Sequence, residues 1–327
     1  MRNKILDYFR NAHGEYVSGQ QISDDLHVSR TAIWKHIKVL KERGYVFESS
    51  TRKGYRLLHA PNLLTELEIN SVLSTESFGH NIIYRETAPS TNAIAKEEAR
   101  RGAPEGTIVV AEEQTGGRGR LQRAWFSPYA KGIWFSLILR PHFSPLEASK
   151  CTLLAAVALA RAFHKAGLTE AGIKWPNDLL VKRRKIVGIL TEMDATMEEI
   201  NYIVMGIGIN TDVARVDLPE DLRDKATSFL LEGVRIPRKE LLNLILMELE
   251  TLYTEVEHNG FANILDEWRK YSVTLGRDIN VITPGYTYSG KAIDIDSDGC
   301  LLVETDHGVE RVLAGEVSIR YKDEPAL

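Results

Sequence analysis

Cysteine is scarce in this 327-residue sequence. The two cysteines, Cys151 and Cys300, are far apart and form no C-x-x-C pair, and the nine histidines show no metal-ligand spacing. Such cysteines are typical of reduced, structural thiols and not of a disulfide framework or a zinc site. We therefore assign no residue as a metal ligand.

Long apolar runs are also missing. The longest candidate is an apolar helical segment that begins at Cys151, and Arg161 interrupts it well short of the roughly 18 residues that a membrane span needs. The first ten residues, MRNKILDYFR, lack the apolar segment and the cleavage site of a secretory signal. We expect a cytoplasmic protein without a membrane partner, and its length allows two or three globular domains.

The charge is distributed unevenly along the chain, although the formal net charge is only -4. Residues 1–60 contain eleven Lys and Arg against six Asp and Glu, which gives +5, and the remaining 30 basic and 39 acidic residues give -9. A basic module joined to an acidic body predicts a nucleic-acid partner for the module alone. The alternative is the ordinary charge variation of a small domain.

Three helices and a hairpin are predicted within residues 1–60. Apolar residues lie on one face of each helical segment: Ile5, Leu6 and Phe9, then Ile22 and Leu26, then Ile33, Ile37 and Leu40. Ser29 is placed to cap the third helix, and Gly44 ends it. Two strands, YVFES and GYRLL, follow. This order of elements is typical of a winged helix-turn-helix domain.

The third helix would enter the DNA major groove, and the hairpin tip would meet phosphate. The polar face of the helix and the tip supply the candidate DNA-binding residues Arg30, Thr31, Lys35, Lys38, Arg52 and Lys53. The alternative is a solvated helix face beside an ordinary hairpin. The apolar face, the cap, the glycine and the basic tip all favour DNA binding.

The acidic body begins after a linker at residues 60–64, with a helix at about Thr65–Leu73. Strands and helices then alternate in a pattern that predicts a mixed sheet with several hairpins. Two helices at about residues 238–258 and 262–271 lead to short strands between Ile279 and Ile319. The pairs Asp298-Gly299 and His307-Gly308 are hairpin signals, so we expect a small β-barrel there.

Four stretches of the body depart from core patterning. TAPSTN (Thr87–Asn92) places small polar groups at a helix N-terminus, where they would bind a polar ligand or simply cap the helix. GGRGRLQR (Gly116–Arg123) combines backbone amides with guanidinium groups and predicts an anion site. It lacks the order of a Walker loop, and its place between two strong strands argues against an RNA-binding tail.

The other two stretches lie further along the chain. IKWPNDLL (Ile173–Leu180) places Lys174, Asn177 and Asp178 around a turn, which alone would be unremarkable. Lys185 precedes an apolar strand, although KRRK is equally consistent with a solvated turn. MGIGIN brings two glycines and Asn210 to the end of another strand, and glycines in a strand often mark only a close backbone approach.

Together and in this order, STN, GRGR, KWPND, the lysine of KIVGIL and GIGIN resemble the biotin protein ligases, in the long form that doubles as the biotin operon repressor. The resemblance runs over essentially the whole chain. It implies an α+β multidomain protein with a winged helix-turn-helix domain at 1–60, a catalytic domain at 65–273 and an SH3-like β-barrel at 274–327. The catalytic domain would have the mixed sheet of class II aminoacyl-tRNA synthetases and lipoate ligases.

The resemblance also implies a two-step reaction. Biotin and ATP, with Mg²⁺, would give biotinyl-5'-AMP, from which biotin passes to a lysine of a biotin carboxyl carrier protein, that of acetyl-CoA carboxylase. The adenylate would also be the corepressor that favours a homodimer on operator DNA. A non-catalytic biotin-sensing repressor and a lipoate-type ligase are the alternatives. The presence of both GRGR and the lysine argues against the first, and the KWPND and GRGR pair behind a winged helix argues against the second.

Site residues follow from the matching motifs. Biotin would contact Ser90, Thr91, Asn92, Gln114, Arg118, Gly119, Arg120 and Lys185, and catalysis would rest on Arg118, Arg120, Lys185 and Asp178. Lys174, Asn177 and Asn210 would bind the nucleotide. Asp178 is our candidate for orienting or deprotonating the acceptor lysine. The sequence departs from the family pattern at Leu121 and Gln122, which follow GRGR where the family often has Arg-Gly.

Overall fold

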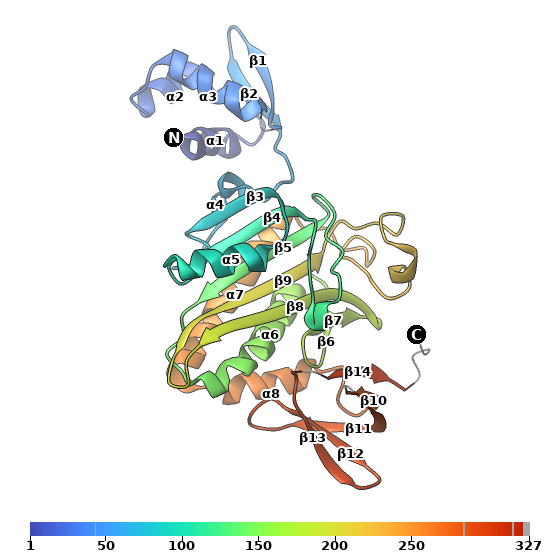
Figure 1. The fold of residues 1–327 in the computed structure, drawn as a ribbon. Helices are drawn as coiled ribbons and strands as arrows, with labels where there is room; N and C mark the ends of the chain where they lie inside the picture. Colours follow the sequence, from blue (N-terminus) through green and yellow to red (C-terminus); the bar gives the residue numbers. More distant parts are fainter. Residues whose placement is uncertain (43, 284, 316, 323–327) are drawn as a thin grey trace. The chain divides into compact units, whose positions relative to one another are not determined.

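The computed structural model describes residues 1–42, 44–283, 285–315 and 317–322, which form two compact units, Met1–Leu73 and Ser74–Leu327 (Figure 1). Each unit has its own core. None of the helices within the described residues is long and apolar enough to cross a membrane.

The first unit has the element order predicted for residues 1–60. It contains α1 (Arg2–Asn11), α2 (Gly19–Asp25), α3 (Arg30–Glu42), β1 (Val46–Ser50), β2 (Gly54–His59) and α4 (Glu66–Asn70). The apolar faces of the first three helices meet in one core with Tyr45 and Phe47 of the hairpin segment. Ser29 Oγ accepts a hydrogen bond from the Ala32 N–H at 3.2 Å, as expected for a residue that caps α3.

The short helix α4 packs within the first unit, whereas the sequence placed it at the start of the second domain. Leu67 belongs to the core of the first unit. Glu68 is buried and accepts hydrogen bonds from Arg10 Nη2 at 2.9 Å and from the Tyr45 hydroxyl. Apolar periodicity identifies a helix but does not indicate which core the helix joins. Here the ion pair between Arg10 of α1 and Glu68 helps to hold α4 on the first unit.

The centre of the second unit is a seven-stranded mixed sheet in the order β3-β4-β5-β9-β8-β7-β6. Its strands are β3 (Ile82–Ala88), β4 (Ile108–Gln114), β5 (Gly132–Leu139), β6 (Gly172–Lys174), β7 (Asp178–Val181), β8 (Arg184–Ala195) and β9 (Ile200–Asn210). The pair β3 and β4 is parallel and the other neighbours are antiparallel. The prediction of a mixed sheet is therefore confirmed.

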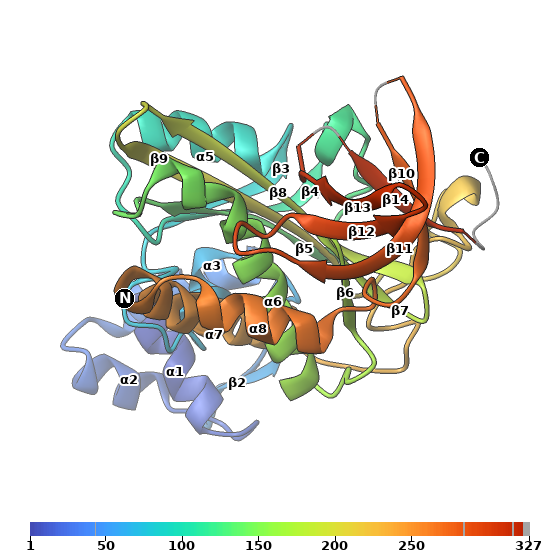
Figure 2. The same ribbon diagram turned by 90° about the horizontal axis from the view of Figure 1, so that it is seen from below.

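Helices cover both faces of this sheet (Figure 2). One face carries α5 (Thr91–Arg100), and the other carries α6 (Cys151–Lys165), α7 (Arg238–Asn259) and α8 (Ala262–Tyr271). Because α6 lies between the sheet and two helices, it is apolar on nearly all sides. At the start of α7, Arg238 Nη2 pairs with Glu112 Oε2 at 2.8 Å, and both side chains are fully buried.

The C-terminal segment forms a five-stranded antiparallel sheet in the order β13-β12-β11-β10-β14. Its strands are β10 (Asp278–Ile282), β11 (Thr287–Ile295), β12 (Leu301–Thr305), β13 (Gly308–Val312) and β14 (Ser318–Tyr321). Gly299 lies in the first predicted turn and Gly308 follows the second, at the start of β13, with positive φ of 78° and 121°, where glycine is favoured. Residues 323–327 of the predicted C-terminal domain lie outside the described residues.

Candidate active site and nucleic-acid interface

A row of residues crosses the sheet on the face covered by α5. Trp134 of β5 is paired with Gly208 of β9, Gly208 with Gly188 of β8, and Gly188 with Asp178 of β7. Residues directly opposite in antiparallel strands share a face of the sheet. Two adjacent glycines therefore form a flat floor between an aromatic ring and a carboxylate.

The indole of Trp125 covers this floor. A Cβ built on Gly208 would lie 2.3 Å from Trp125 Nε1, and one on Gly188 would lie 2.9 Å from Cζ3. Both positions need glycine because any side chain would displace the ring. Trp125 Nε1 is buried, and within the described residues it has no hydrogen-bond partner. Sequence reasoning gave Trp125 no role, although the strand glycines indicated that something approached the sheet closely.

Lys185 and Asp178 meet at the edge of the floor. Lys185 Nζ lies 2.7 Å from Asp178 Oδ1 and 5.1 Å from the centre of the Trp125 ring. The backbone of Lys185 is held by the neighbouring segment, because its N–H donates to the Lys225 carbonyl at 2.7 Å and its carbonyl accepts from the Thr227 N–H at 2.9 Å. The lysine predicted from KRRK therefore has a fixed place beside a carboxylate and is not part of a free turn.

Arg120 is the most constrained guanidinium of the Gly/Arg loop. Its Nη1 donates to Asn177 Oδ1 at 3.3 Å. Its Nη2 donates to three carbonyl oxygens of the C-terminal domain, those of Ala314, Gly315 and Val317. Burial lowers the pKa of Arg120, and nearby Asp178 raises it. Arginine stays charged in proteins, so one cation ties together the loop, the KWPND turn and the C-terminal domain.

The rest of this loop is a tight hairpin. The Trp125 N–H donates to the Gly117 carbonyl and the Gly119 N–H to the Arg123 carbonyl, at 2.9 and 2.8 Å. Arg118 points to solvent, where its Nη1 donates to Gln122 Oε1 at 3.0 Å. The turn residues Leu121 and Gln122 have positive φ of 54° and 58°, which side chains disfavour. The departure noted in the sequence therefore lies at the strained tip of the loop.

A second polar group lies at the N-terminus of α5. Gln114 Oε1 accepts from the Thr91 N–H at 2.9 Å and from the Thr91 hydroxyl at 3.2 Å, and Gln114 Nε2 donates to Ser127 Oγ at 3.0 Å. Ser90 is the N-cap residue, but its side chain makes no capping hydrogen bond. A Cβ on Gly117 would lie 3.2 Å from Gln114 Nε2. The start of the Gly/Arg loop thus touches this group.

Asn92 is turned inward in the structure. Its Oδ1 accepts from the Ser136 hydroxyl at 2.6 Å, and its Nδ2 donates to the Leu190 carbonyl at 3.1 Å and to Glu192 Oε2 at 2.9 Å. A Cβ on Gly206 would lie 1.9 Å from Asn92 Oδ1, so this glycine makes room for the amide. Sequence reasoning did not find Ser136 or Glu192, because nothing local marks a serine or a glutamate within a strand.

The three predicted nucleotide ligands have separate partners. Asn177 Nδ2 donates to the Ile189 carbonyl at 2.8 Å, and its Oδ1 accepts from Arg120. Asn210 Nδ2 donates to the Thr227 carbonyl at 3.0 Å. Lys174 Nζ lies 4.7 Å from the ring centre of Tyr321, on the C-terminal sheet. The structure brings Asn177, Asp178, Lys185 and Arg120 together, and it directs the Lys174 ammonium and the Arg118 guanidinium elsewhere.

In the first unit, the predicted DNA-binding residues are exposed. Arg30, Thr31, Lys35 and Lys38 lie on the outer face of α3, and Arg52 and Lys53 lie at the turn between β1 and β2. Sequence reasoning missed Trp34, which is 52% exposed on the same face, with Lys38 Nζ 5.9 Å from its ring centre.

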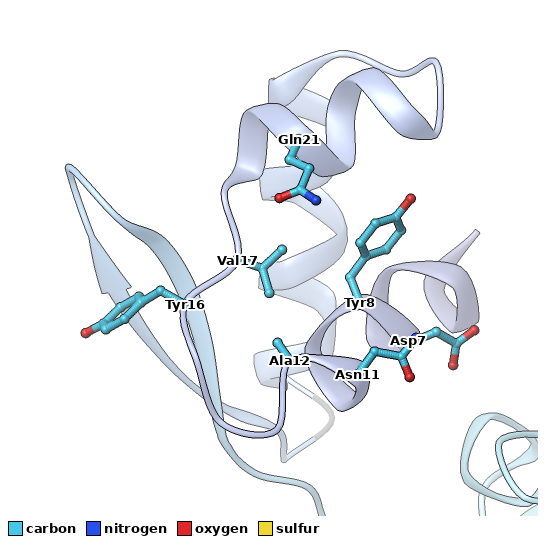
Figure 3. Close-up of a pocket in the computed structure, with 7 residues that line it drawn as sticks. All are labelled: Asp7, Tyr8, Asn11, Ala12, Tyr16, Val17 and Gln21. Carbon is cyan, nitrogen blue, oxygen red and sulfur yellow. The ribbon is translucent and has the colours of Figure 1, made fainter.

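Tyr16 lies beside the half of the hairpin that is nearest the turn. Lys53 Nζ lies 5.5 Å and Arg56 Cζ 5.0 Å from its ring centre, and Arg56 Nε donates to Glu48 Oε2 at 3.0 Å. A depression of about 340 Å³ lies nearby and is lined by Tyr8, Tyr16 and Gln21 among others. In Figure 3, the Tyr8 and Gln21 side chains extend toward one another, while Tyr16 turns toward the hairpin. The depression contains none of the predicted site residues.

Comparison with known proteins accounts for all three parts of the chain. The family model described as an HTH domain matches residues 1–56, that of the Biotin/lipoate A/B protein ligase family matches 84–210, and that of the Biotin protein ligase C terminal domain matches 274–320. A curated relative, the Bifunctional ligase/repressor BirA of Bacillus spizizenii, is 42% identical over 98% of each chain. The chain belongs to the bifunctional biotin ligase/repressor family.

Other members of this family and of the related ligases match more distantly. The Bifunctional ligase/repressor BirA of Escherichia coli is 31% identical over 94% of each chain. The solved structure of the biotin protein ligase from Aquifex aeolicus in complex with biotin and ATP is 26% identical, with a TM-score of 0.65, and covers 74% of this chain and 100% of its own. The family assignment thus includes the helix-turn-helix domain, the mixed-sheet catalytic domain and the C-terminal domain.

Proposed function

We propose that this protein is an ATP-dependent biotin protein ligase and a transcriptional repressor. In the first reaction the biotin carboxylate attacks the α-phosphate of ATP, which gives biotinyl-5'-AMP and releases pyrophosphate. In the second, a lysine of the biotin carboxyl carrier protein of acetyl-CoA carboxylase attacks the acyl carbon and AMP leaves. The observation that carries the proposal is the cluster of Lys185, Asp178 and Arg120 beside the glycine floor.

The first reaction brings a carboxylate to a triphosphate, and each pair of like unit charges ~4 Å apart costs about 4 kcal/mol at an effective dielectric near 20. Fixed cations offset that cost best when they need no rearrangement. The backbone of Lys185 is held by two hydrogen bonds and its ammonium lies 2.7 Å from Asp178 Oδ1, whereas the Arg120 guanidinium donates to four oxygen atoms. We assign Lys185 to the carboxylate and the α-phosphate, and Arg118, Gly119 and Arg120 to closure over the anions.

Biotin and the nucleotide would occupy opposite ends of this floor. The group of Ser90, Thr91 and Gln114 would hold the biotin head, with Asn92 behind it. Asn177 and Asn210 would line the nucleotide side, and Lys174 would join them by turning from Tyr321. Biotin is the substrate whose head group matches a polar end and whose carboxylate matches the cationic end.

ATP would arrive with Mg²⁺. Within the described residues no group of three or more His, Cys, Asp or Glu side chains is placed to hold a metal ion. Mg²⁺ fits such a site because it is commonly bound by substrate phosphates and water with one or two carboxylates, and Asp178 supplies a carboxylate. When bound, the ion would neutralise phosphate charge.

In the second reaction, Asp178 would orient the incoming lysine or accept its proton. Its carboxylate is 23% exposed and touches Lys185, so it lies within reach of a group that approaches the acyl carbon. We predict that Asp178→Asn slows transfer from preformed biotinyl-5'-AMP by roughly 10²-fold or more, as expected for lost general-base catalysis. Unchanged single-turnover transfer to the carrier would remove this role from Asp178.

Exchange of labelled pyrophosphate into ATP is the decisive test of the enzyme. We expect exchange that depends on biotin and is unaffected by lipoate. Exchange with lipoate instead would make the protein a lipoate-type ligase. Binding of biotin without any exchange would make it a biotin-sensing repressor that lacks catalysis.

The repressor activity would reside in the first unit, through α3 and the hairpin. We propose that biotinyl-5'-AMP is the corepressor and favours a homodimer, which binds operator DNA of two-fold symmetry. A dimer suits a single small module because two copies double the number of base contacts. A mobility shift of operator DNA that requires both biotin and ATP is the expected result, and a shift of equal strength without them would exclude a corepressor.

A further inference from the structure

A chain of hydrogen bonds runs from the protein surface to the end of the site proposed for biotin. Lys96 Nζ donates to Glu192 Oε1 at 2.6 Å, and Glu192 Oε2 accepts from Asn92 Nδ2 at 2.9 Å. The chain continues from Asn92 Oδ1 to the Ser136 hydroxyl at 2.6 Å and from Ser136 to the Thr91 hydroxyl at 2.8 Å. Lys96 and Glu192 are about one third exposed, whereas Asn92, Ser136 and Thr91 are buried.

The outer end of the chain fixes the orientation of the Asn92 amide. An ionised carboxylate and a backbone carbonyl only accept hydrogen bonds. Asn92 therefore directs its NH₂ group to Glu192 and to the Leu190 carbonyl, and its oxygen lies toward Ser136. The reversed amide would place its oxygen against both acceptors.

This orientation determines the direction of every following hydrogen bond. Because Asn92 Oδ1 is an acceptor, the single proton of the Ser136 hydroxyl is used there, and Ser136 Oγ is left as an acceptor. The Thr91 hydroxyl donates to Gln114 Oε1 at 3.2 Å, and its oxygen lies 2.8 Å from Ser136 Oγ. Its proton is therefore used inside the protein, and Thr91 Oγ1 offers only lone pairs to a ligand.

We propose that Glu192, held by Lys96, is a positioning residue that makes the Thr91 hydroxyl a hydrogen-bond acceptor and thereby selects a ligand that presents an N–H group. The inference rests on the proposed function, in which the ligand is biotin. The ureido ring of biotin carries two N–H donors, and lipoate, which has a dithiolane ring, carries none. Glu192 acts through Asn92 and Ser136 and does not touch the ligand.

Lys96 makes the inference testable, because it controls which way a glutamine at position 192 would turn. In Glu192→Gln, the ammonium requires the amide oxygen, so the amide NH₂ faces Asn92. Two NH₂ groups then oppose each other, and a reversed Asn92 would relieve this only by placing its oxygen against the Leu190 carbonyl, so the chain is mispaired in either orientation. In the double variant with Lys96→Met, the glutamine is free to present its oxygen to Asn92.

The wild type, Glu192→Gln, Lys96→Met and the double variant are compared by calorimetric titration with biotin and by pyrophosphate exchange. We expect Glu192→Gln to weaken biotin binding roughly tenfold, the cost of about one mispaired buried hydrogen bond. KM for biotin should rise by a similar factor, while kcat and KM for ATP stay within about twofold. Lys96→Met should change biotin affinity less than about threefold, and the double variant should return close to the wild type.

The double variant separates positioning from ordinary structural support. If Glu192 only stabilised the fold, removing Lys96 as well would weaken binding further, and a double variant no better than Glu192→Gln would overturn the inference. Unchanged biotin affinity in Glu192→Gln would overturn it too. Glu198→Gln, at an exposed site on the same hairpin, is the matched control. Failure of the wild type itself to bind biotin would contradict the proposed function instead.

Discussion

At the scale of single residues, the site depends on glycines as much as on charged side chains. Gly188 and Gly208 admit the Trp125 ring, and Gly206 admits the Asn92 amide. A methyl group at Gly206 would lie 1.9 Å from the amide oxygen, a contact that no rotation of a flexible chain relieves because Asn92 is bonded at both ends. The three glycines thus determine where the polar and aromatic groups of the site lie.

Lys185 is the residue whose loss should affect adenylation most. We predict that Lys185→Met lowers the rate of biotin-dependent pyrophosphate exchange by roughly 10²- to 10³-fold, because one fixed group that stabilises transition-state charge contributes about that much. Lys225→Met is the matched control, since Lys225 is exposed and contacts Lys185 only through its backbone. Equal rates for the two variants would show that the ammonium of Lys185 does not participate.

Trp34 is a large aromatic residue exposed on the DNA-facing side predicted for α3, so we expect it to contact DNA. We predict that Trp34→Ala weakens binding to operator DNA by roughly tenfold without changing the salt dependence, because an indole contacts thymine methyl groups or sugars and displaces no counterions. Lys38→Met should reduce the slope of log affinity against log salt by about one. Anisotropy titrations at several salt concentrations, on operator selected from random DNA, measure both effects. A slope altered by Trp34→Ala would contradict the prediction.

At the scale of elements, periodicity predicted most of the fold. The i, i+4, i+7 spacing of Ile33, Ile37 and Leu40 gave α3 its correct face, and all three side chains are buried. The strands that flank GRGR and KWPND were predicted because each is a compact apolar run. The α4 helix was assigned to the wrong core, since five residues carry too little periodicity to identify a partner.

The candidate site was predictable only in part, because some of its contacts join residues that are far apart in the sequence. Short motifs identified Lys185, Asp178 and Arg120, because their residue types cluster in the chain. The partners of Asn92 lie 44 and 100 positions away, in Ser136 and Glu192, and their pairing depends on strand register. Register is set by the whole sheet and is not readable from any one strand.

The Gly/Arg loop should behave as a lid. Its tip holds two non-glycine residues at positive φ, and its arginines at 118 and 123 are exposed or partly exposed, so trypsin should cut it in the ligand-free protein. We predict that biotin with ATP slows cleavage at Arg118–Arg123 several-fold, because ordering the loop over the adenylate removes it from the protease. Cleavage at Arg52 in the first unit is the internal reference. An unchanged ratio of the two cleavage rates would mean that the loop is no lid.

At the scale of the whole molecule, the two units differ in the sign of their net charge. Residues 1–73 carry 11 Lys and Arg against 8 Asp and Glu, or +3, which suits contact with phosphates, and the remaining 30 basic and 37 acidic residues give -7. Excess negative charge in the larger unit disfavours its own approach to DNA. This distribution supports the proposal that the first unit binds operator DNA.

Carrier protein should act as the signal that releases DNA. We predict that adding the biotin carboxyl carrier domain to the complex of protein, biotin, ATP and operator dissociates the DNA, because transfer consumes the adenylate. A carrier whose acceptor lysine is replaced by arginine is the control, since it binds the same surface but accepts no biotin. Equal dissociation by both carriers would show competition for a surface and not consumption of the corepressor.

The hydrogen bonds from Arg120 to the C-terminal domain can form only after that domain has been synthesised. The carbonyl partners of Arg120 begin at Ala314, 194 residues later in the chain. At the usual rates of translation, these partners are made roughly 10 to 40 s after the loop itself. A nascent chain on the ribosome therefore has its glycine floor and Lys185 before it has an anchored loop. Under the proposed function, the loop would therefore become able to enclose the reactive intermediate only after the C-terminal domain has been made.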